Sequence, residues 1–293
     1  MTEILVLSSA NYSNNTTENY GDCILIKTAD DFVIYDCGHE KHAETAMSYM
    51  DKHNIRTAKV ILSHNDSDHF DGIPVLLDYG RVSIIKTTLL LKYSDDILNC
   101  IDDNRVTRES VKRHILEKYD NIAKLSGAPI EDIYEHPEDV CPGVSIVGPD
   151  FQYMIETVAK RLDGREGDSK DGETAVNATS IQASVRVGMH KVLLCGDCSF
   201  TSIEDKVRDY QCIQLPHHGK SKQAEKIWAK KWNQSNDLYI VSDNTGSHNG
   251  GSDNLITTGH RVLNTKDGKN IQIDRSCFES CSFKTYRTLG VYT

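Results

Sequence analysis

Long apolar runs are missing from this sequence, and so are the marks of a secreted protein. No run approaches the roughly eighteen apolar residues that a membrane helix needs. The first residues, MTEILVLSSANYS, have no basic segment, and their apolar stretch is too short for a secretory signal. Nine cysteines, an odd number without framework spacing, lie scattered from Cys23 to Cys281, which favours a reducing compartment. We therefore expect a cytoplasmic protein that does not associate with a membrane.

An excess of positive charge is also absent. The 33 basic residues face 43 acidic ones, and the net charge of −10 argues against a general attraction to nucleic acid or anionic lipid, although a local basic groove stays possible. The 293 residues, 38% of them hydrophobic, suffice for a large buried core. We find no internal repeat and no clear linker, so we expect one domain over residues 1–293.

Short β-branched runs alternate with helical patterns along the chain, which predicts an α/β protein. The predicted strands are 4–9, 23–28, 32–37, 59–63, 83–91, 144–149, 180–187, 191–197, 212–216 and 238–243. The predicted helices are 42–53, 69–80, 105–126, 151–162, 199–209 and 223–233. The polar, Gly-rich and Asp-rich stretch 161–175 predicts a loop.

Polar clusters occur where the predicted strands end, which is where layered α/β proteins keep their functional sites. These clusters are Asp36-Cys37-Gly38, His64 to His69, Asn177, Gly196-Asp197 and His217-His218-Gly219, with His248 as a further candidate. We expect Asp36 to order the backbone near the site rather than to bind metal.

The run His64-Asn65-Asp66-Ser67-Asp68-His69 concentrates side chains that can bind metal. Imidazole and carboxylate ligands together suit divalent transition metals. An Asx-rich turn is a simpler interpretation of the same residues. A calcium loop is disfavoured, because Phe70 stands where an EF-hand has Asp or Asn.

This H-x-D-x-D-H run, placed after a buried strand, resembles the H-x-H-x-D-H signature of the metallo-β-lactamase superfamily. Asp in the third position resembles the variant found in the ComEC-like DNA-uptake nuclease domains. Further segments resemble that group in the same order: NYGDCILI (19–26), VIYDCG (33–38), VNATSIQASVRVGMHKVLLCGDCS (176–199), QLPHHGKS (214–221) and the closing strand pair LNTKDGKNIQI (263–273). The resemblance implies a four-layer αββα sandwich, with a helical insertion around 92–140.

The resemblance also implies a centre of two divalent ions, zinc or manganese, and assigns its ligands by position. His64 and Asp66 would bind the first ion and Asp68, His69 and His218 the second, with Asp197 bridging the two. Asn177 stands where most of the superfamily has a third histidine, and we keep it as a ligand of the oxygen-rich first site.

Hydrolysis by a hydroxide that bridges the two ions is the expected reaction. Among the catalytic candidates are Asp68 and His217. His248 is a third, since it could protonate the leaving oxygen, and a surface-loop histidine is the alternative interpretation.

Basic and aromatic residues after His218 indicate a phosphodiester substrate, DNA or RNA. The set consists of Lys220, Lys222, Lys226, Lys230 and Lys231, with Trp228 and Trp232 interleaved. Of these, Lys220 and Lys222 are the expected substrate-binding residues, and basic residues within 105–118 could form a second arm. The alternatives are a solvated helix face with both Trp side chains in the core, and a small-molecule phosphodiesterase or ester or thioester hydrolase.

The sequence Cys195-Gly196-Asp197-Cys198 allows a different class of protein. A C-x-x-C between a strand and a helix is typical of thiol oxidoreductases. That interpretation leaves the histidine clusters unexplained, so we favour the hydrolase.

Overall fold

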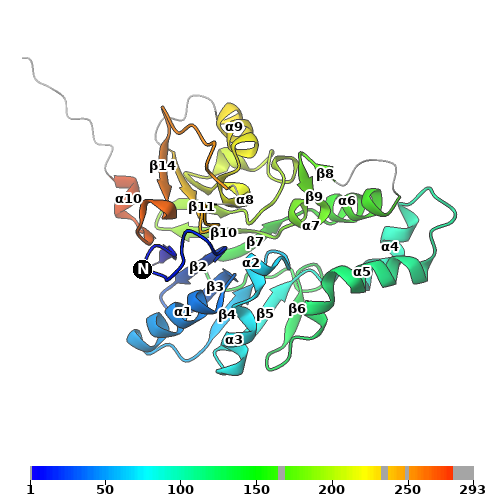
Figure 1. The fold of residues 1–293 in the computed structure, drawn as a ribbon, viewed down its shortest axis with the longest axis horizontal. Helices are drawn as coiled ribbons and strands as arrows, with labels where there is room; N and C mark the ends of the chain where they lie inside the picture. The colour runs from blue at the N-terminus through cyan, green and yellow to red at the C-terminus, as the bar shows by residue number, and fades with distance from the viewer. Residues whose placement is uncertain (1, 164–168, 232–236, 248–250, 280–293) are drawn as a thin grey trace, which may run out of the picture.

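Two β-sheets packed face to face form the body of the molecule (Figure 1). The computed structural model describes residues 2–163, 169–231, 237–247 and 251–279. Among these residues a seven-stranded sheet has the order β15-β1-β2-β3-β4-β5-β6, and a six-stranded sheet has the order β14-β13-β12-β11-β10-β7. The first sheet comprises β1 (Glu3–Val6), β2 (Cys23–Lys27), β3 (Phe32–Cys37), β4 (Ala58–Ile61), β5 (Val82–Thr87), β6 (Ile130–Asp132) and β15 (Ile271–Ile273). The second comprises β7 (Val144–Gly148), β10 (Gln182–Val187), β11 (His190–Leu194), β12 (Cys212–Gln214), β13 (Leu238–Val241) and β14 (Arg261–Asn264).

Helices and one small hairpin complete the architecture. The helices are α1 (Glu40–Lys52), α2 (Ser67–Phe70), α3 (Ile73–Asp78), α4 (Ser94–Asn99), α5 (Arg108–Ala123), α6 (Phe151–Asp163), α7 (Ala175–Ala178), α8 (Pro216–Gly219), α9 (Ser221–Lys230) and α10 (Ser276–Glu279). Short 3-10 turns are η1 (Leu90–Tyr93), η2 (Phe200–Ser202), η3 (Val207–Asp209) and η4 (Thr265–Asp267). The hairpin pairs β8 (Ser169–Lys170) with β9 (Glu173–Thr174).

The central strands are buried along their whole length because both of their faces are covered. All six residues of β3, FVIYDC, are buried. Val33 and Tyr35 point into the core between the sheets, whereas Phe32 and Ile34 belong to the outer cluster with α1 and α3. Full burial of such a side chain stabilises the fold by about 1.5–3 kcal/mol.

Helices cover the two outer faces, which gives the αββα sandwich expected from the sequence (Figure 1). Helix α1 buries Ala43, Ala46 and Met50, one face of a helix at three- and four-residue spacing. On the other sheet, α9 buries Ala224 and Ile227 and leaves its lysines toward solvent.

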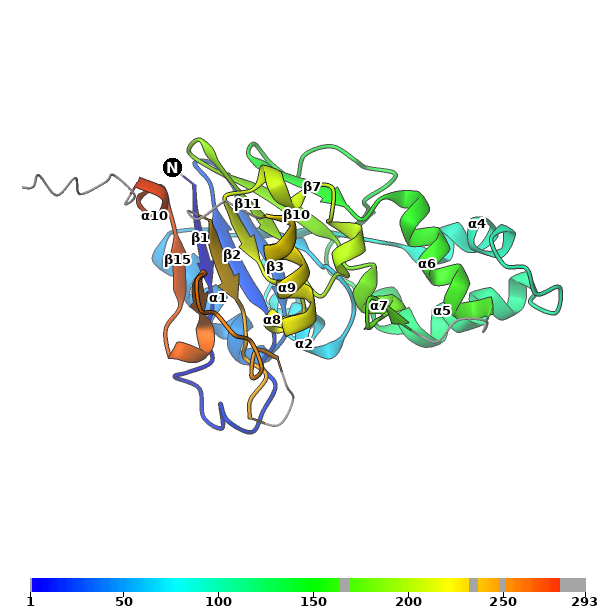
Figure 2. The same ribbon diagram turned by 90° about the horizontal axis from the view of Figure 1, so that it is seen from above.

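A group of helices lies at one end of the sandwich, on the side away from α10 (Figure 2). Helices α4 and α5 from the expected insertion pack with α6 around a separate apolar cluster that includes Ile97, Ile115 and Met154. A capping box of Thr107 and Ser110 begins α5. The helical part of the range 92–140 ends at Ala123, and β6 then pairs with β5 in the first sheet.

Several sequence-based expectations differ from the structure. Residues 199–209 form two 3-10 turns rather than one helix, and the predicted loop 161–175 contains the end of α6 and the β8–β9 hairpin. The expected closing pair is split, since β14 joins β13 in one sheet and β15 joins β1 in the other. Within the described part of the chain, every helix is too short or too polar to cross a bilayer.

Parallel pairing brings the polar strand ends to one edge of the sandwich. Strands β3, β4 and β5 run parallel in one sheet, and β11, β12 and β13 run parallel in the other. The carboxyl ends of parallel strands meet at a common edge, where the loops that follow them can share one site. Near this edge Tyr35 links the two sheets, because its hydroxyl donates a 2.6 Å hydrogen bond to the carbonyl of Ile181.

Candidate metal centre

Asp36, at the end of β3, organises the loop that carries the predicted signature. The residue is fully buried and has a left-handed backbone with φ of 56°, a conformation that Asp tolerates better than most residues. Its Oδ1 accepts from the Ser63 backbone at 2.7 Å, and its Oδ2 accepts from Ser63 Oγ at 2.7 Å and from His69 Nδ1 at 2.8 Å. Both carboxylate oxygens are thereby occupied, as expected for a residue that orders the loop.

His64 is oriented by two serine hydroxyls. Its Nδ1 lies 2.9 Å from Ser63 Oγ and 3.2 Å from Ser180 Oγ. Since Ser63 Oγ donates its own hydrogen to Asp36, it accepts one from His64 Nδ1. The lone pair of His64 is then on Nε2, and the ring of His64 lies 4.1 Å from that of His69 between centroids.

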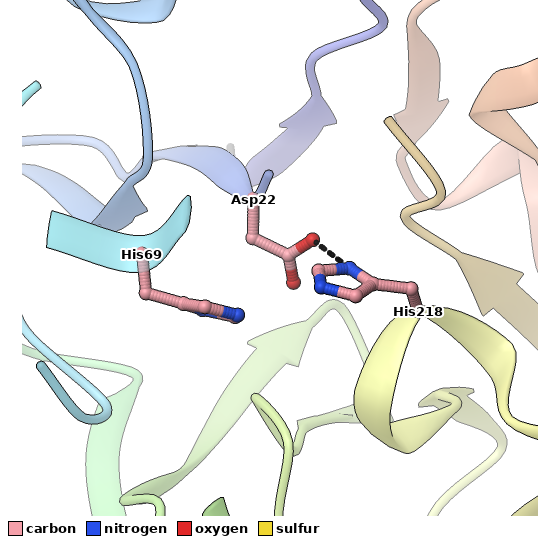
Figure 3. A group of neighbouring side chains, drawn as sticks. All are labelled: Asp22, His69 and His218. Carbon is pink, nitrogen blue, oxygen red and sulfur yellow. Dashed lines mark hydrogen bonds and ion pairs between the residues drawn. The ribbon is translucent and has the colours of Figure 1, made fainter. Parts of the chain in front are cut away.

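His218 is anchored from the opposite sheet by Asp22. His217 and His218 both adopt left-handed backbone angles, with φ of 52° and 53°, in the turn after β12. His218 Nδ1 lies 3.1 Å from Asp22 Oδ1 and 3.0 Å from the carbonyl of Ser242, two acceptors that fix the proton on Nδ1. Figure 3 shows the ring of His69 and the ring of His218 approaching from opposite sides, with the Asp22 carboxylate beside them. Asp22 Oδ2 also accepts from Gln214 at 3.0 Å, and the ligand atoms of Asp22, His69 and His218 all lie within 4.8 Å of one another.

Ligand atoms from both sheets converge on Asp197. The atoms offered by His64, His69 and Asp197 all lie within 4.8 Å of one another. His69 Nε2 is 3.2 Å from Asp197 Oδ1, but not in hydrogen-bonding orientation. Among the described residues, His64 Nε2, His69 Nε2 and Asp197 Oδ1 are buried without a hydrogen-bond partner. Buried polar atoms rarely stay unsatisfied, and three that converge fit a divalent cation.

The charges of this cluster reinforce one another. Burial lowers the pKa of His69, but the carboxylates of Asp197 and Asp36 outweigh burial and raise this pKa well above its ordinary value. The pKa of His218 is likewise raised against burial, chiefly by Asp197. Burial also opposes ionisation of Asp197, but the nearby imidazoles hold its pKa well below the usual range. A divalent cation would therefore replace protons on the histidines, which couples metal binding to proton release.

The remaining signature carboxylates lie at the mouth of the centre. Asp68 Oδ2 is 3.1 Å from His218 Nε2 and accepts from Asn19 at 2.8 Å. Burial raises the pKa of Asp68, but the hydrogen bond from His218 outweighs burial, so the pKa lies below its ordinary value. Asp66 is half-exposed, with Oδ2 at 3.7 Å from His64 Nε2.

Asn177 is brought to the centre, but its orientation differs from that of a ligand. Its Oδ1 accepts from the hydroxyl of Thr174 at 2.6 Å, and its Nδ2 faces Asp197 Oδ2 at 3.3 Å. An amide nitrogen that carries two hydrogens cannot coordinate a metal ion. In this orientation Asn177 supports the carboxylate of Asp197 and offers no oxygen to a metal.

A second buried carboxylate, Glu173 of β9, organises the residues beside the centre. It interacts with His217 Nδ1, with Lys220 Nζ at 2.9 Å and with Gln223 Nε2 at 2.8 Å. An open pocket of about 440 Å³ lies next to this group, lined by Gly172, His217, Lys220, Ser221, Lys222, Gly251 and Asn254. Sequence analysis missed both Glu173 and Asp22; the only available signal was a Gly-Asp pair in one of the matching segments.

Most of the expected basic arm is neutralised within the chain. Lys226 pairs with Asp171 at 2.8 Å and Lys230 with Glu204 at 3.0 Å. The buried Lys231 pairs with an aspartate, Asp237, at 3.1 Å.

The remaining residues singled out in the sequence are the two tryptophans, His248 and the C-x-x-C pair. Trp228 packs in the outer apolar cluster and stacks on His260 at 3.9 Å between ring centroids. Trp232 and His248 lie outside the described residues. Cys195 and Cys198 are free and buried, and burial raises the pKa of the Cys195 thiol, which disfavours a reactive thiolate.

Comparisons with known proteins agree with the fold. The family model Lactamase_B, described as the metallo-beta-lactamase superfamily, matches residues 16–153. The chain is similar to the metallo-beta-lactamase fold protein YhfI from Bacillus subtilis, with 14% identity, a TM-score of 0.54, and coverage of 93% of this chain and 99% of that one. It is also similar to Tm1679, a metal-dependent hydrolase of the beta-lactamase superfamily, with 15% identity, a TM-score of 0.51, and coverage of 94% and 100%. A comparison with curated proteins found no match.

Together these findings show the metallo-β-lactamase fold with a buried cluster of candidate metal ligands. The matched segment contains the signature His64 to His69, and the structure completes it with Asp197 and His218 from the other sheet. The family model matches less than half of the chain, and the similar structures agree with the αββα fold.

Proposed function

We propose that this protein hydrolyses phosphodiesters, with DNA or RNA as substrate, by means of two divalent metal ions. Lys220 and Lys222 line an open pocket together with His217, whose Nε2 lies 3.8 Å from Asp197 Oδ2, and this adjacency carries the proposal. A scissile phosphate needs positive charge and hydrogen-bond donors close to the metal centre. Asp66 in the signature makes the ligand set rich in oxygen, which suits manganese as well as zinc.

The ligands divide between the two sheets. The first sheet supplies His64, Asp66, Asp68 and His69, and the second supplies Asp197 and His218. When bound, two ions lower the pKa of water between them and stabilise charge on the attacking and leaving oxygens. Asp197 would hold the pair together, because it lies between the two ligand sets: its ligand atom is within 4.8 Å of those of His64 and His69, and its Oδ2 lies 3.9 Å from His218 Nε2.

The two lysines of the pocket have different surroundings. Lys220 is held by Glu173 and by the carbonyl of Gly172 at 3.0 Å, so its ammonium group has a fixed position. Lys222 forms no ion pair with any residue that the structure describes, and its charge is available to a phosphate. A fixed donor next to a free one suits a substrate that carries a repeating phosphate charge.

A small-molecule phosphodiesterase, or an ester or thioester hydrolase, is the second candidate. The ion pairs of Lys226, Lys230 and Lys231 favour it, because they remove most of the charge that would follow a nucleic-acid backbone. The net charge of −10 acts in the same direction.

The test is cleavage by protein loaded with manganese or zinc. Single- and double-stranded DNA and RNA are compared with bis(p-nitrophenyl) phosphate and a small thioester, at low and high salt. We expect nucleic-acid cleavage that weakens steeply as salt rises, and that is lost in Asp68→Ala. Cleavage of the small diester alone, without salt dependence, would select the second candidate. Turnover of the thioester alone would exclude phosphodiester chemistry.

A further inference from the structure

Three histidines of this site share one arrangement. His69 has the carboxylate of Asp36 on its Nδ1, His218 has that of Asp22, and His217 has that of Glu173. In each pair the carboxylate is buried. A carboxylate on one ring nitrogen fixes the proton there and leaves the lone pair on the other nitrogen, and this is how metal-binding histidines are held.

The buried carboxylate of Glu173 holds the side chains beside the metal centre. The side chain is 1% exposed, and besides His217 it contacts only Lys220 and Gln223 among the described residues. Both of those groups donate to Glu173, so its oxygens remain acceptors toward His217. His217 therefore carries its proton on Nδ1 and directs the lone pair of Nε2 away from Glu173.

The lone pair of His217 points to the same oxygen that Asn177 faces. His217 Nε2 lies 3.8 Å from Asp197 Oδ2, close to the 3.9 Å that separates His218 Nε2 from that oxygen. Asn177 Nδ2 approaches the same atom at 3.3 Å. Separations of 3–4 Å between ligand atoms are those expected around one metal ion with bonds of about 2.0–2.2 Å.

We propose that His217 is a further metal ligand on the Oδ2 side of Asp197, and that Glu173 is its positioning residue. The inference rests on the metal centre of the proposed function but not on the choice of substrate. A rival role, in which His217 only hydrogen-bonds a substrate oxygen, makes a different prediction for metal binding in the absence of substrate.

Metal titration without substrate separates these roles. Cobalt(II) binding is followed by calorimetry and by visible absorption for the wild type, His217→Asn and Glu173→Gln. Asn is chosen because it tolerates the left-handed backbone of position 217. Lys222→Ala, a change in the first turn of α9 that lines the same pocket, is the matched control.

We expect His217→Asn to weaken one bound ion by more than about tenfold and to change the cobalt spectrum. Glu173→Gln should weaken the same ion by about 10- to 100-fold, the usual cost of losing a group that orients a ligand. Lys222→Ala should leave both affinity and spectrum unchanged. Unaltered affinity and spectrum in His217→Asn would overturn the proposal.

Diffraction from zinc-loaded wild-type crystals gives a test that needs no variant. His217 Nε2 at about 2.0–2.1 Å from a zinc ion supports the proposal, and a ring turned away from every zinc ion refutes it. Because neither measurement involves cleavage, a failure to hydrolyse phosphodiesters would reject the proposed function and leave the role of His217 standing.

Discussion

Replacing Asp36 with Asn tests whether a buried carboxylate controls the metal-binding atom of His69. The change keeps the size of the side chain and suits the φ of 56°, since Asn also tolerates left-handed backbone. One amide oxygen can still accept from the Ser63 backbone at the place of Oδ1. The new NH₂ group then faces Ser63 Oγ and His69 Nδ1, two atoms that donate to Asp36 in the native chain.

The consequence for His69 is a change of tautomer. With an NH₂ group opposite, Nδ1 has to accept, so the ring hydrogen moves to Nε2, the atom that faces Asp197. That atom can no longer bind a metal without losing its hydrogen. We expect metal affinity to fall 10- to 100-fold, as for other groups that orient metal ligands.

Stability should fall as well, because a buried ion pair loses one partner. Such a loss costs about 3–5 kcal/mol, which for a chain of this size lowers Tm by roughly 6–20 °C. Thermal unfolding in EDTA measures the loss of stability, and competition with a chelator for zinc measures the loss of metal affinity. Glu44→Gln, an exposed charge removal on α1, is the control and should change stability by less than about 0.5 kcal/mol. Wild-type metal affinity in Asp36→Asn would refute the reasoning.

Three further outcomes follow from the structure. Asp197→Asn should abolish hydrolysis and leave less than one tightly bound ion per chain, measured by elemental analysis; two retained ions would argue against a bridging carboxylate. Without metal, His69 and His218 keep their protons to higher pH when folded, so their stabilising effect is complete below about pH 6.5 and is lost as pH rises through the raised pKa values. Urea unfolding in EDTA should therefore show lower stability at pH 9 than at pH 6, and the reverse order would contradict these shifts. Lys231→Met should cost about 3–5 kcal/mol by leaving Asp237 buried and unpaired, with activity per folded molecule unchanged in denaturation and rate measurements.

The alternation of strands and helices was predicted from local pattern, whereas the αββα sandwich came from the resemblance to the metallo-β-lactamase superfamily. Buried strands such as β3 and β4 consist mainly of apolar residues. Polar residues at or just beyond their carboxyl ends, including Asp36 and His64, interrupt that pattern. Parallel pairing then brings such interruptions together, so the convergence of His69 with Asp197 could be anticipated.

Partners across long stretches of chain could not be anticipated. Asp22 is separated from His218 by 196 residues, and Glu173 from His217 by 44. No local period encodes such a pairing, and the stretch that carries Glu173 has the composition of a loop. For the same reason the lysines after His218 were expected to be available to a substrate. The ion pair of Lys226, for example, is with Asp171, which lies 55 positions earlier in the chain.

The division of the metal ligands between the two sheets has a consequence during synthesis of the chain. The signature His64 to His69 leaves the ribosome about 150 residues before His218, at roughly 5–20 residues per second. For that interval of some ten to thirty seconds the first sheet exposes half a coordination shell. The full set of ligands comes together only after β12 has joined the second sheet and the two sheets have packed. Metal binding would therefore indicate that the sheets are assembled.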